Sequence, residues 1–498
     1  MAAWFYVAGS LGAIYAGDYL TLFLFWEMMA FASVFLIWFR RGPQSIAVGY
    51  RYLLIHTIGG VVLLAGILLR YQAVGNITFD LMDVANPQLY TWLIMIGLGL
   101  NAAMVPLHSW LPEAYSEASF NGAVFLCAFT TKTAVYTLAR ACAGMDILVV
   151  LGVVMALYGV IYAVMENDIR KLLAWSIVSQ VGYMVAGIGI GTDMAINGAV
   201  AHAVVHILYK SLLFMGTGAV LYMTGKTKFT ELGGLHARMP LTFLFTAIGC
   251  LSISAAPCFA AYVSKSMIIG AGFEAHQYWA AWLLMFGATG TFIYNGLKLP
   301  YFLFFGTNNC SPDTWQKAAD PTANMVFAMT LGATLCVLVG VAPGALYGLL
   351  PHAVDYTPYT AYHLVETLQL LGFAALAFYL LKRFIEPVDR ICVDIDWLYR
   401  KAGRGFLWLA KRPLQWGDAV WGEAYRVVGL HSLMTLSRFW SWFDWHAIDG
   451  VVDGLARSVR VLGGRVRLLQ SGQIQLTLFT AFSLAAIVLV TYIFFQLS

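Results

Sequence analysis

Apolar runs of about 20 residues, separated by short polar stretches, follow one another along most of the chain. A helix needs a run of about that length to cross the hydrocarbon core of a bilayer. The pattern predicts membrane-spanning segments at residues 2–17, 19–39, 48–70, 90–106, 119–140, 146–165, 172–191, 195–223, 240–273, 277–305, 323–344, 361–381 and 476–496. We therefore expect an all-α polytopic membrane protein with about 13 transmembrane helices.

Basic residues between these segments indicate the orientation. They gather at four places, around Arg40 and Arg41, Arg170 and Lys171, Lys226 and Lys228, and Lys382 and Arg383. An even number of predicted segments separates each place from the next, so all four lie on one side of the membrane. The positive-inside rule makes that side cytoplasmic.

Prolines interrupt two of the predicted segments. Pro106 and Pro112 follow the fourth segment in "VPLHSWLPEAY", and Pro257 lies inside the ninth. Because proline removes a backbone donor and clashes with the preceding turn, we expect a broken helix at each place. Each break is the fourth of five consecutive segments, and an odd number of segments turns the second set over in the membrane. The pattern thus predicts two inverted five-helix repeats, over residues 1–145 and 146–305.

The rest of the chain is expected to form three further regions. Residues 306–384 hold two additional transmembrane helices, and residues 474–498 form a C-terminal transmembrane anchor. Residues 385–473 mix short apolar runs with a large share of the basic residues and tryptophans. This mixture is typical of an amphipathic helix at a membrane surface, here a lateral arm on the cytoplasmic side. A cytoplasmic globular domain is the alternative.

The composition restricts the class of function. Of 498 residues, 60% are hydrophobic and 11% are charged, and the mean hydropathy is +0.75, which excludes a soluble enzyme. The net charge of +4 is too small to indicate nucleic-acid binding. The seven cysteines lie without metal-ligand spacing, and the glycine-rich strings "GIGIGTD" and "GLGLN" fall in apolar helices. We expect no cofactor and no metal in this chain.

Ionisable side chains inside the predicted spans are the candidate functional groups. They are Glu27, Lys132, Lys210 and Lys265. Each buried charge costs about 2.5–3.5 kcal/mol on insertion scales unless it is paired or hydrated. His202, His206 and Lys210 are spaced by four residues and therefore share one face of a helix. The structural alternatives are lysines that reach to the headgroups and histidines that are satisfied within the core.

These groups suit a proton relay. Removal from water destabilises the charged forms of lysine and glutamate, which brings their proton affinities closer together. Histidine accepts a proton on one ring nitrogen while it donates one from the other. We expect a hydrated polar line near mid-membrane through Glu27, Lys132, His202 or His206, Lys210 and Lys265.

Several long motifs resemble the antiporter-like, proton-conducting subunits shared by respiratory complex I, membrane-bound hydrogenases and Mrp-type Na⁺/H⁺ antiporters. "TLFLFWEMMAF" resembles the glutamate helix of this family, "PLHSWLPEAYSEA" its signature after the first broken helix, "ENDIRKLLAWSIVSQVGYM" the start of its central helix, and "HAVVHILYKSLLF" its histidine–lysine helix. The resemblance is strong over roughly residues 1–305, and the lateral arm and anchor resemble those of the most distal complex I subunit and its relatives. It implies a relay of Glu27, Lys132, His202, His206, Lys210 and Lys265, modulated by Asn101, Pro106, His108 and Pro257.

Two features depart from the family pattern. Asn101, five residues before the first proline of the signature, replaces a lysine that usually pairs with the family's glutamate. Glu27 therefore pairs elsewhere, for example with Lys132, or is protonated at rest. The first three spans of the family are also missing from this sequence. Three explanations are open: the protein lacks them, the choice of start site has shortened the chain, or another polypeptide supplies them.

We predict a proton-translocating subunit of a multisubunit membrane complex, with Mrp-type cation/proton antiport placed first because of "YRYLLIHTIGG" and "TTKTAVYTLAR". The alternatives are a proton-pumping subunit of a complex I-like or hydrogenase redox complex, whose redox site lies on a partner, and a non-conducting scaffold subunit. The expected partners are other membrane subunits, the lipid bilayer, protons and Na⁺, without nucleic acid. The expected location is the bacterial cytoplasmic membrane.

Overall fold

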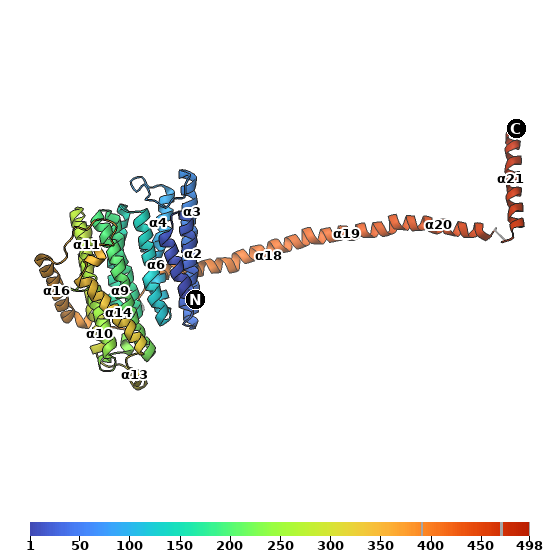
Figure 1. The fold of residues 1–498 in the computed structure, drawn as a ribbon. Helices are drawn as coiled ribbons and strands as arrows, with labels where there is room; N and C mark the ends of the chain where they lie inside the picture. Colours follow the sequence, from blue (N-terminus) through green and yellow to red (C-terminus); the bar gives the residue numbers. More distant parts are fainter. Residues whose placement is uncertain (390–391, 469–471, 498) are drawn as a thin grey trace. The chain divides into compact units, whose positions relative to one another are not determined.

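The computed structural model describes residues 1–389, 392–468 and 472–497, whose regular structure is helical apart from two isolated β-bridges. The chain divides into two compact units, Met1–Asp396 and Trp397–Ser498, and the first is a closely packed helical bundle (Figure 1). Nine of the described helices are long and apolar enough to cross a membrane, and three shorter apolar helices accompany them. The chain is therefore an all-helical polytopic membrane protein.

The bundle consists of two consecutive sets of helices. The first set is α1 (Ala2–Tyr15), α2 (Tyr19–Trp38), α3 (Pro43–Val74), α4 (Leu89–Asn101), α5 (Trp110–Glu117) and α6 (Phe120–Ala141). The second set is α7 (Asp146–Met165), α8 (Ile169–Ile190), α9 (Asp193–Thr224), α10 (Pro240–Ile253), α11 (Tyr262–Glu274) and α12 (Tyr278–Thr291), followed by π-helical turns at Phe292–Lys298 and Tyr301–Phe305. These helices lie where the apolar runs predict them.

Two helices are broken where prolines predict a break. The first break separates α4 from α5 and contains Pro106, and the second separates α10 from α11 and contains Pro257. Ala103 and Ala255, each two residues past the end of the preceding helix, both adopt a φ of 56°. A positive φ is strained for alanine, and at each of these residues the backbone turns sharply away from the helix axis. Helices α4 and α10 therefore both end abruptly.

The two sets of helices correspond in detail. Helices α3 and α9 are both 32 residues long, begin 150 residues apart, and end at Gly75 and Gly225, whose left-handed φ closes each helix. The two isolated bridges, Asp18 with Thr78 and Asp168 with Lys228, are also displaced by 150 residues. A residue of α3 therefore has its counterpart 150 positions later in α9.

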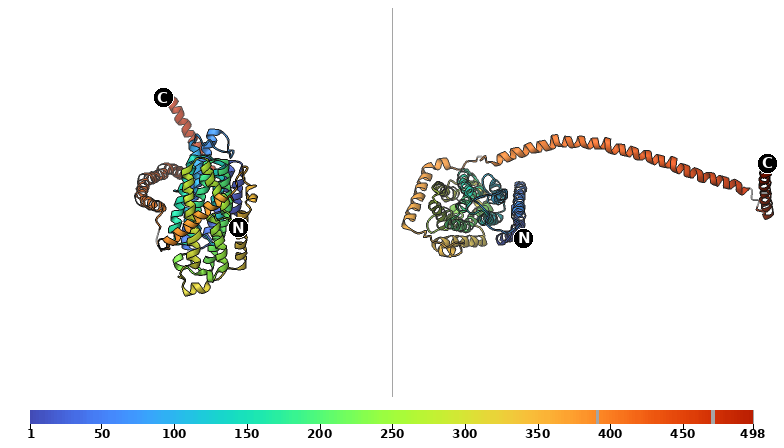
Figure 2. Two further views of the ribbon diagram at one scale, coloured as in Figure 1. Left: turned by 90° about the vertical axis from the view of Figure 1, so that its left-hand side faces the viewer. Right: turned by 90° about the horizontal axis from the view of Figure 1, so that it is seen from above.

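The remaining helices of the first unit are α13 (Pro312–Lys317), α14 (Ala323–Val341), α15 (Gly344–Tyr347) and α16 (Ala361–Ile385). Seen from above, the helices of this unit run side by side (Figure 2). The most apolar stretch of α8 is wholly buried in the bundle, whereas those of α14 and α16 are 22% and 11% buried. Helix α8 is thus the centre of the bundle, and α14 and α16 turn most of their apolar surface outward.

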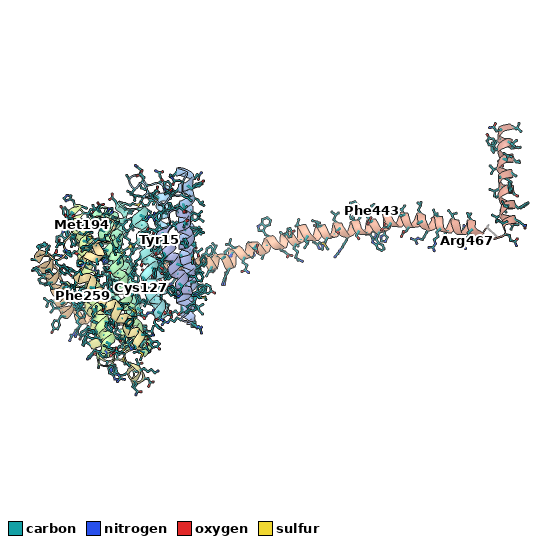
Figure 3. All side chains as sticks on the ribbon, in the orientation of Figure 1. Tyr15, Cys127, Met194, Phe259, Phe443 and Arg467 are labelled. Atoms are coloured by element: carbon teal, nitrogen blue, oxygen red, sulfur yellow. The ribbon has the colours of Figure 1, made fainter. Side chains whose placement is uncertain are left out.

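The second unit contains a long helical run followed by one apolar helix. The run passes without interruption through α17 (Asp396–Leu409), α18 (Gln415–Ala424), α19 (Ser432–Phe443) and α20 (Asp449–Leu468), joined by π-helical turns. Its side chains, Phe443 among them, project on all sides without burial (Figure 3). Helix α21 (Ile474–Leu497) is uniformly apolar. Residues 397–468 therefore form a helix and not the globular domain of the alternative.

Candidate functional site

Helix α9 presents three ionisable groups in the interior of the bundle. His202, His206 and Lys210 are each 0% exposed. His202 Nδ1 lies 2.9 Å from Ser264 Oγ of α11, and its Nε2 lies 3.4 Å from the hydroxyl of Tyr209. The Lys210 ammonium donates a hydrogen bond to the Leu173 carbonyl of α8 at 3.1 Å. The spacing of four residues thus directs all three side chains into the interior of the bundle, where Lys210 contacts the central helix α8.

His206 lies among the other buried ionisable groups. Neither ring nitrogen makes a hydrogen bond to any described residue, although the ring is fully buried. Four groups from three helices lie within electrostatic range of it: Lys132, His202, Lys210 and Lys265. A buried imidazole without partners usually marks a bound water or a functional role.

Lys132 of α6 approaches this cluster from the first half of the bundle. Its ammonium donates to the Cys127 carbonyl at 2.7 Å and to Thr131 Oγ1 at 3.0 Å. Cys127, labelled in Figure 3, lies 3.8 Å through its sulfur from the hydroxyl of Ser211, the residue that follows Lys210. The two lysines therefore lie on adjoining helices, and the Cys127 thiol lies within electrostatic range of both.

Lys265 is held by the second broken helix. It lies on α11, and its ammonium donates to the Ile253 carbonyl at the end of α10, at 3.2 Å across the break. The ring of Tyr183 from α8 lies 4.8 Å from the same nitrogen. Carbonyls at the end of a helix have no partner within it, so the break supplies the acceptor that this ammonium needs.

A cavity of about 490 Å³ opens beside Lys265. Its polar lining includes Ser266 of α11, Thr289 of α12, Tyr356 from the segment before α16, and His363 and Glu366 of α16 itself. It is large enough for several waters. The polar side chains give such waters hydrogen-bonding partners beside Lys265.

Glu27 lies apart from the lysines. Its Oε1 is buried against α3 and makes no hydrogen bond to the described residues. A Cβ placed on Gly60 would overlap this oxygen, so only glycine leaves room for the carboxyl group at that position. Lys132 directs its ammonium to Cys127 and Thr131, and the described residues contain no ion pair between Glu27 and Lys132. The pairing considered from the sequence is therefore not formed.

Asn101 ends α4 and is 1% exposed, and both polar atoms of its side chain are without a hydrogen-bond partner among the described residues. It lies close to the imidazole of His56 from α3, although the geometry falls short of a hydrogen bond. His56 was not singled out from the sequence. The repeat offset of 150 residues, which makes it the counterpart of His206, is the signal that identifies it.

His108, in the first break, contacts the segment that precedes α17. Its Nε2 lies 3.4 Å from Asp394 Oδ1, and the hydroxyl of Tyr158 donates to the same oxygen. Burial by itself raises the pKa of Asp394, but the close contact with His108 and the hydrogen bond from Tyr158 outweigh it and hold the pKa below its ordinary value. Asp394 lies outside the predicted spans, so sequence reasoning passed over it.

The described residues contain no cluster of three or more metal-ligating side chains. The site therefore consists of two breaks, at Pro106 and Pro257, and the buried groups arranged around them. Groups that exchange protons at neutral pH, held 3 Å apart or one water apart, are able to pass protons along. The lysines and histidines of α6, α9 and α11 lie within electrostatic range of His206, and no ion pair joins Glu27 to any of them among the described residues.

Known proteins resemble this chain over most of its length. The family "NADH:quinone oxidoreductase/Mrp antiporter, TM" matches residues 16–293, more than half of the chain. Hydrogenase-4 component B of Escherichia coli is 28% identical over 394 residues, which cover 71% of this chain and 58% of that protein. Na(+)/H(+) antiporter subunit A1 of Staphylococcus aureus is 30% identical over 381 residues, which cover 68% of this chain and 47% of that protein. The chain thus spans about half the length of the curated relatives it matches.

Two solved structures share the fold. A chain of the Mrp complex from Dietzia sp. DQ12-45-1b superposes with a TM-score of 0.63 at 22% identity, covering 76% of this chain and 78% of that chain. A chain of the membrane-bound sulfane sulfur reductase, an archaeal respiratory membrane complex, superposes with a TM-score of 0.62 at 25% identity, covering 74% and 76%. Both agree with an antiporter-like arrangement of the helices.

Proposed function

Because the chain belongs to the NADH:quinone oxidoreductase/Mrp antiporter family of membrane subunits, we propose that it translocates protons within a multisubunit complex, by Mrp-type cation/proton antiport. One observation carries this proposal. His202, His206, Lys132, Lys210 and Lys265 converge in the interior of the bundle, and none of them has a carboxylate partner among the described ion pairs. Amines and imidazoles buried in this way exchange protons readily, because burial removes much of the preference for the charged form.

The proposed path enters at Glu27 and leaves at Lys265. Lys132 connects the two halves, the α9 ladder carries protons along the centre, and the cavity beside Lys265 provides the outlet. Asn101, Pro106, His108 and Pro257 modulate transfer, because they shape the two breaks that admit water at membrane depth. These roles are proposals that rest on the geometry above.

We propose that the observed helices are grouped into repeats, additional spans, a lateral arm and an anchor. The 150-residue correspondence supports two inverted five-helix repeats, residues 1–145 and 146–305, with two additional spans in 306–384. About 13 spans result when the short and broken helices are counted. Residues 385–473 serve as a lateral arm on the cytoplasmic side, and residues 474–498 anchor its end. The location is a bacterial cytoplasmic membrane, and the partners are other membrane subunits.

Two other functions compete with antiport. The relatives named hydrogenase-4 component B and the sulfane sulfur reductase support a proton-pumping subunit of a redox complex, whose electron carriers lie on partner chains. A non-conducting scaffold is the other candidate, and Asn101 in place of the usual lysine favours it. The buried, carboxylate-free cluster around His206 argues against a scaffold, because an inert subunit has no use for such costly groups.

Purification of the intact complex distinguishes the three functions. Antiport predicts small hydrophobic partner subunits and a proton flux in everted vesicles that follows addition of Na⁺ without an electron donor. A redox pump predicts flavin or iron–sulfur subunits and a flux that requires an electron donor. If the vesicles carry no proton flux under either condition while the complex is intact, the subunit is a scaffold and the proposal is wrong.

A further inference from the structure

We propose that His56 is the proton partner of Glu27 and takes the place of the lysine that Asn101 replaces. This inference rests on the proposed proton translocation and assigns a role to a residue that is not among the relay or modulating residues proposed above. It is carried by three observations: the contacts of His56, the position of the Glu27 carboxyl group, and the register between α3 and α9.

His56 is buried without a hydrogen bond. It is 1% exposed, and neither Nδ1 nor Nε2 has a partner among the described residues. The ring lies between aromatic side chains, with its centroid 4.1 Å from that of Tyr52 and 4.5 Å from that of Trp110. The ring of Tyr52, tilted by 38° to the imidazole, and the ring of Trp110, at 74° to it, pack against His56 from two directions. A merely structural histidine in a core normally donates at least one hydrogen bond.

The Glu27 carboxyl group faces the same side of α3. Its Oε1 occupies the space where a side chain on Gly60 would lie, and Gly60 is one helical turn beyond His56. The nearby amide of Asn101 is also buried and unpartnered. Helices α2, α3 and α4 thus bring together a carboxyl group, an imidazole and an amide, none of which is hydrogen-bonded to a described residue. Ordered water between the three groups would supply the hydrogen bonds that their side chains lack.

The register between the two halves supports the assignment. With the offset of 150 residues, His56 corresponds to His206, Tyr52 to His202, and Gly60 to Lys210. His56 and His206 are alike in being buried, and neither has a ring nitrogen that is hydrogen-bonded to a described residue. The first half therefore has its own ladder on α3. At the position that corresponds to Lys210, α3 has Gly60, which has no side chain. The carboxyl group of Glu27, from α2, occupies that space instead.

The proposed proton transfer involves Glu27, His56 and one bridging water. Protonated Glu27 gives its proton through a bridging water to a ring nitrogen of neutral His56, which leaves a carboxylate and an imidazolium. The imidazolium then releases the proton of its other nitrogen to water on the far side of the ring. This transfer moves one proton and leaves His56 neutral in its other tautomer, with the proton on the nitrogen that accepted it. The pair is ready for the next proton once the imidazole has turned its bare nitrogen back toward Glu27 and Glu27 is protonated again.

Hydroxyl groups continue the path from His56 toward Lys132. Tyr52 shares a hydrogen bond of 2.8 Å with Ser33 and lies within reach of Thr130, which contacts the hydroxyl of Tyr6. The cluster is fully buried and belongs to four helices, α1, α2, α3 and α6. Thr130 is two residues before Lys132 on α6, so these hydroxyls lie between α3 and the helix that holds Lys132.

The test uses the full-length chain in its complex, in everted vesicles, with proton flux as the readout. His56→Gln keeps a polar side chain but carries no proton at neutral pH, and we expect it to lower the flux about tenfold or more. Asn101→Lys in the same chain restores the missing amine, and we expect the double variant to recover flux to within about threefold of the parent. The matched control is His236→Gln, which alters a histidine outside the spans and should leave the flux unchanged.

Several results would overturn the inference. Parental flux in His56→Gln does so, and so does a loss of flux that Asn101→Lys fails to restore in an assembled complex. Should His56→Gln fail to assemble, Gly60→Ala provides the second test, because the added methyl group displaces the Glu27 carboxyl group and leaves His56 in place. Parental flux in Gly60→Ala refutes the pairing. Failure of the proposed function is recognised separately, since the parent complex then carries no flux at all.

Discussion

Lys265 shows at the scale of one residue how a carrier differs from a structural lysine. Its ammonium touches one carbonyl and one aromatic ring, whereas Lys298 donates to two carbonyls at the end of α7, those of Val164 and Glu166. If Lys265 is the outlet group, both Lys265→Ala and Lys265→Arg abolish proton flux in an assembled complex. Arginine keeps the charge but does not release a proton, because its pKa exceeds about 12.

Lys298 is the matched control for this prediction. Lys298→Arg should retain flux, because a guanidinium still donates to the two carbonyls, and Lys298→Ala should lower assembly by leaving them unpaired. Flux and the amount of assembled complex are measured for all four variants. An active Lys265→Arg protein would show that Lys265, like Lys298, is structural.

At the scale of an element, the contact of Asp394 with His108 and Tyr158 ties the start of α17 to the first break. The contacts favour the carboxylate and lower its pKa, so their contribution to stability is present above the unfolded pKa of about 3.9 and is lost only as the pH falls through the lower folded value. The segment should therefore stay equally protected from pH 8 to pH 5. Asp394→Asn at pH 7 removes the charge, and we expect amide hydrogen exchange in residues 392–396 to accelerate about tenfold or more.

Asp389→Asn is the control for Asp394→Asn. Asp389 pairs with Lys228 at the surface, where both side chains are largely exposed and the pair contributes little. Equal exchange rates in the two variants would contradict a specific role for the contact between Asp394 and the first break.

At the scale of the whole molecule, the two units differ in what stabilises them. Residues 1–396 contain the buried core, whereas no residue of α17, α18, α19 or α20 is buried, although the run carries many tryptophans and leucines. Those apolar side chains need lipid or partner subunits to cover them. We expect a chain that ends at residue 396 to insert and fold but to lose association with its partner subunits.

Co-purification of partner subunits measures this loss, and hydrogen exchange over α1–α16 measures the fold. A chain that lacks only residues 474–498 is the comparison, because it keeps the helical run and should retain more of the complex. Normal assembly of the chain that ends at residue 396 would refute the bracing role of the lateral arm.

The sequence by itself determined what depends on local pattern. Apolar length placed the helices, Pro106 and Pro257 marked the two breaks, and the spacing of His202, His206 and Lys210 placed three groups on one face. Each of these follows from the period of a helix or from the chemistry of proline, which neighbouring residues in the sequence decide. The family resemblance likewise rested on continuous motifs.

Only the tertiary structure decided which groups meet. Lys132 and Lys265 lie within electrostatic range of His206 although they are 74 and 59 residues away along the chain, and Asp394 contacts His108 across nearly 290 residues. Glu27 faces Gly60 and not Lys132, because the packing of α2 on α3 leaves a space that only a glycine creates. His56 looks like one histidine in an apolar helix until the fold places it beside Asn101 and in register with His206. Such contacts depend on how helices pack against each other, which the periodicity of a single helix does not encode.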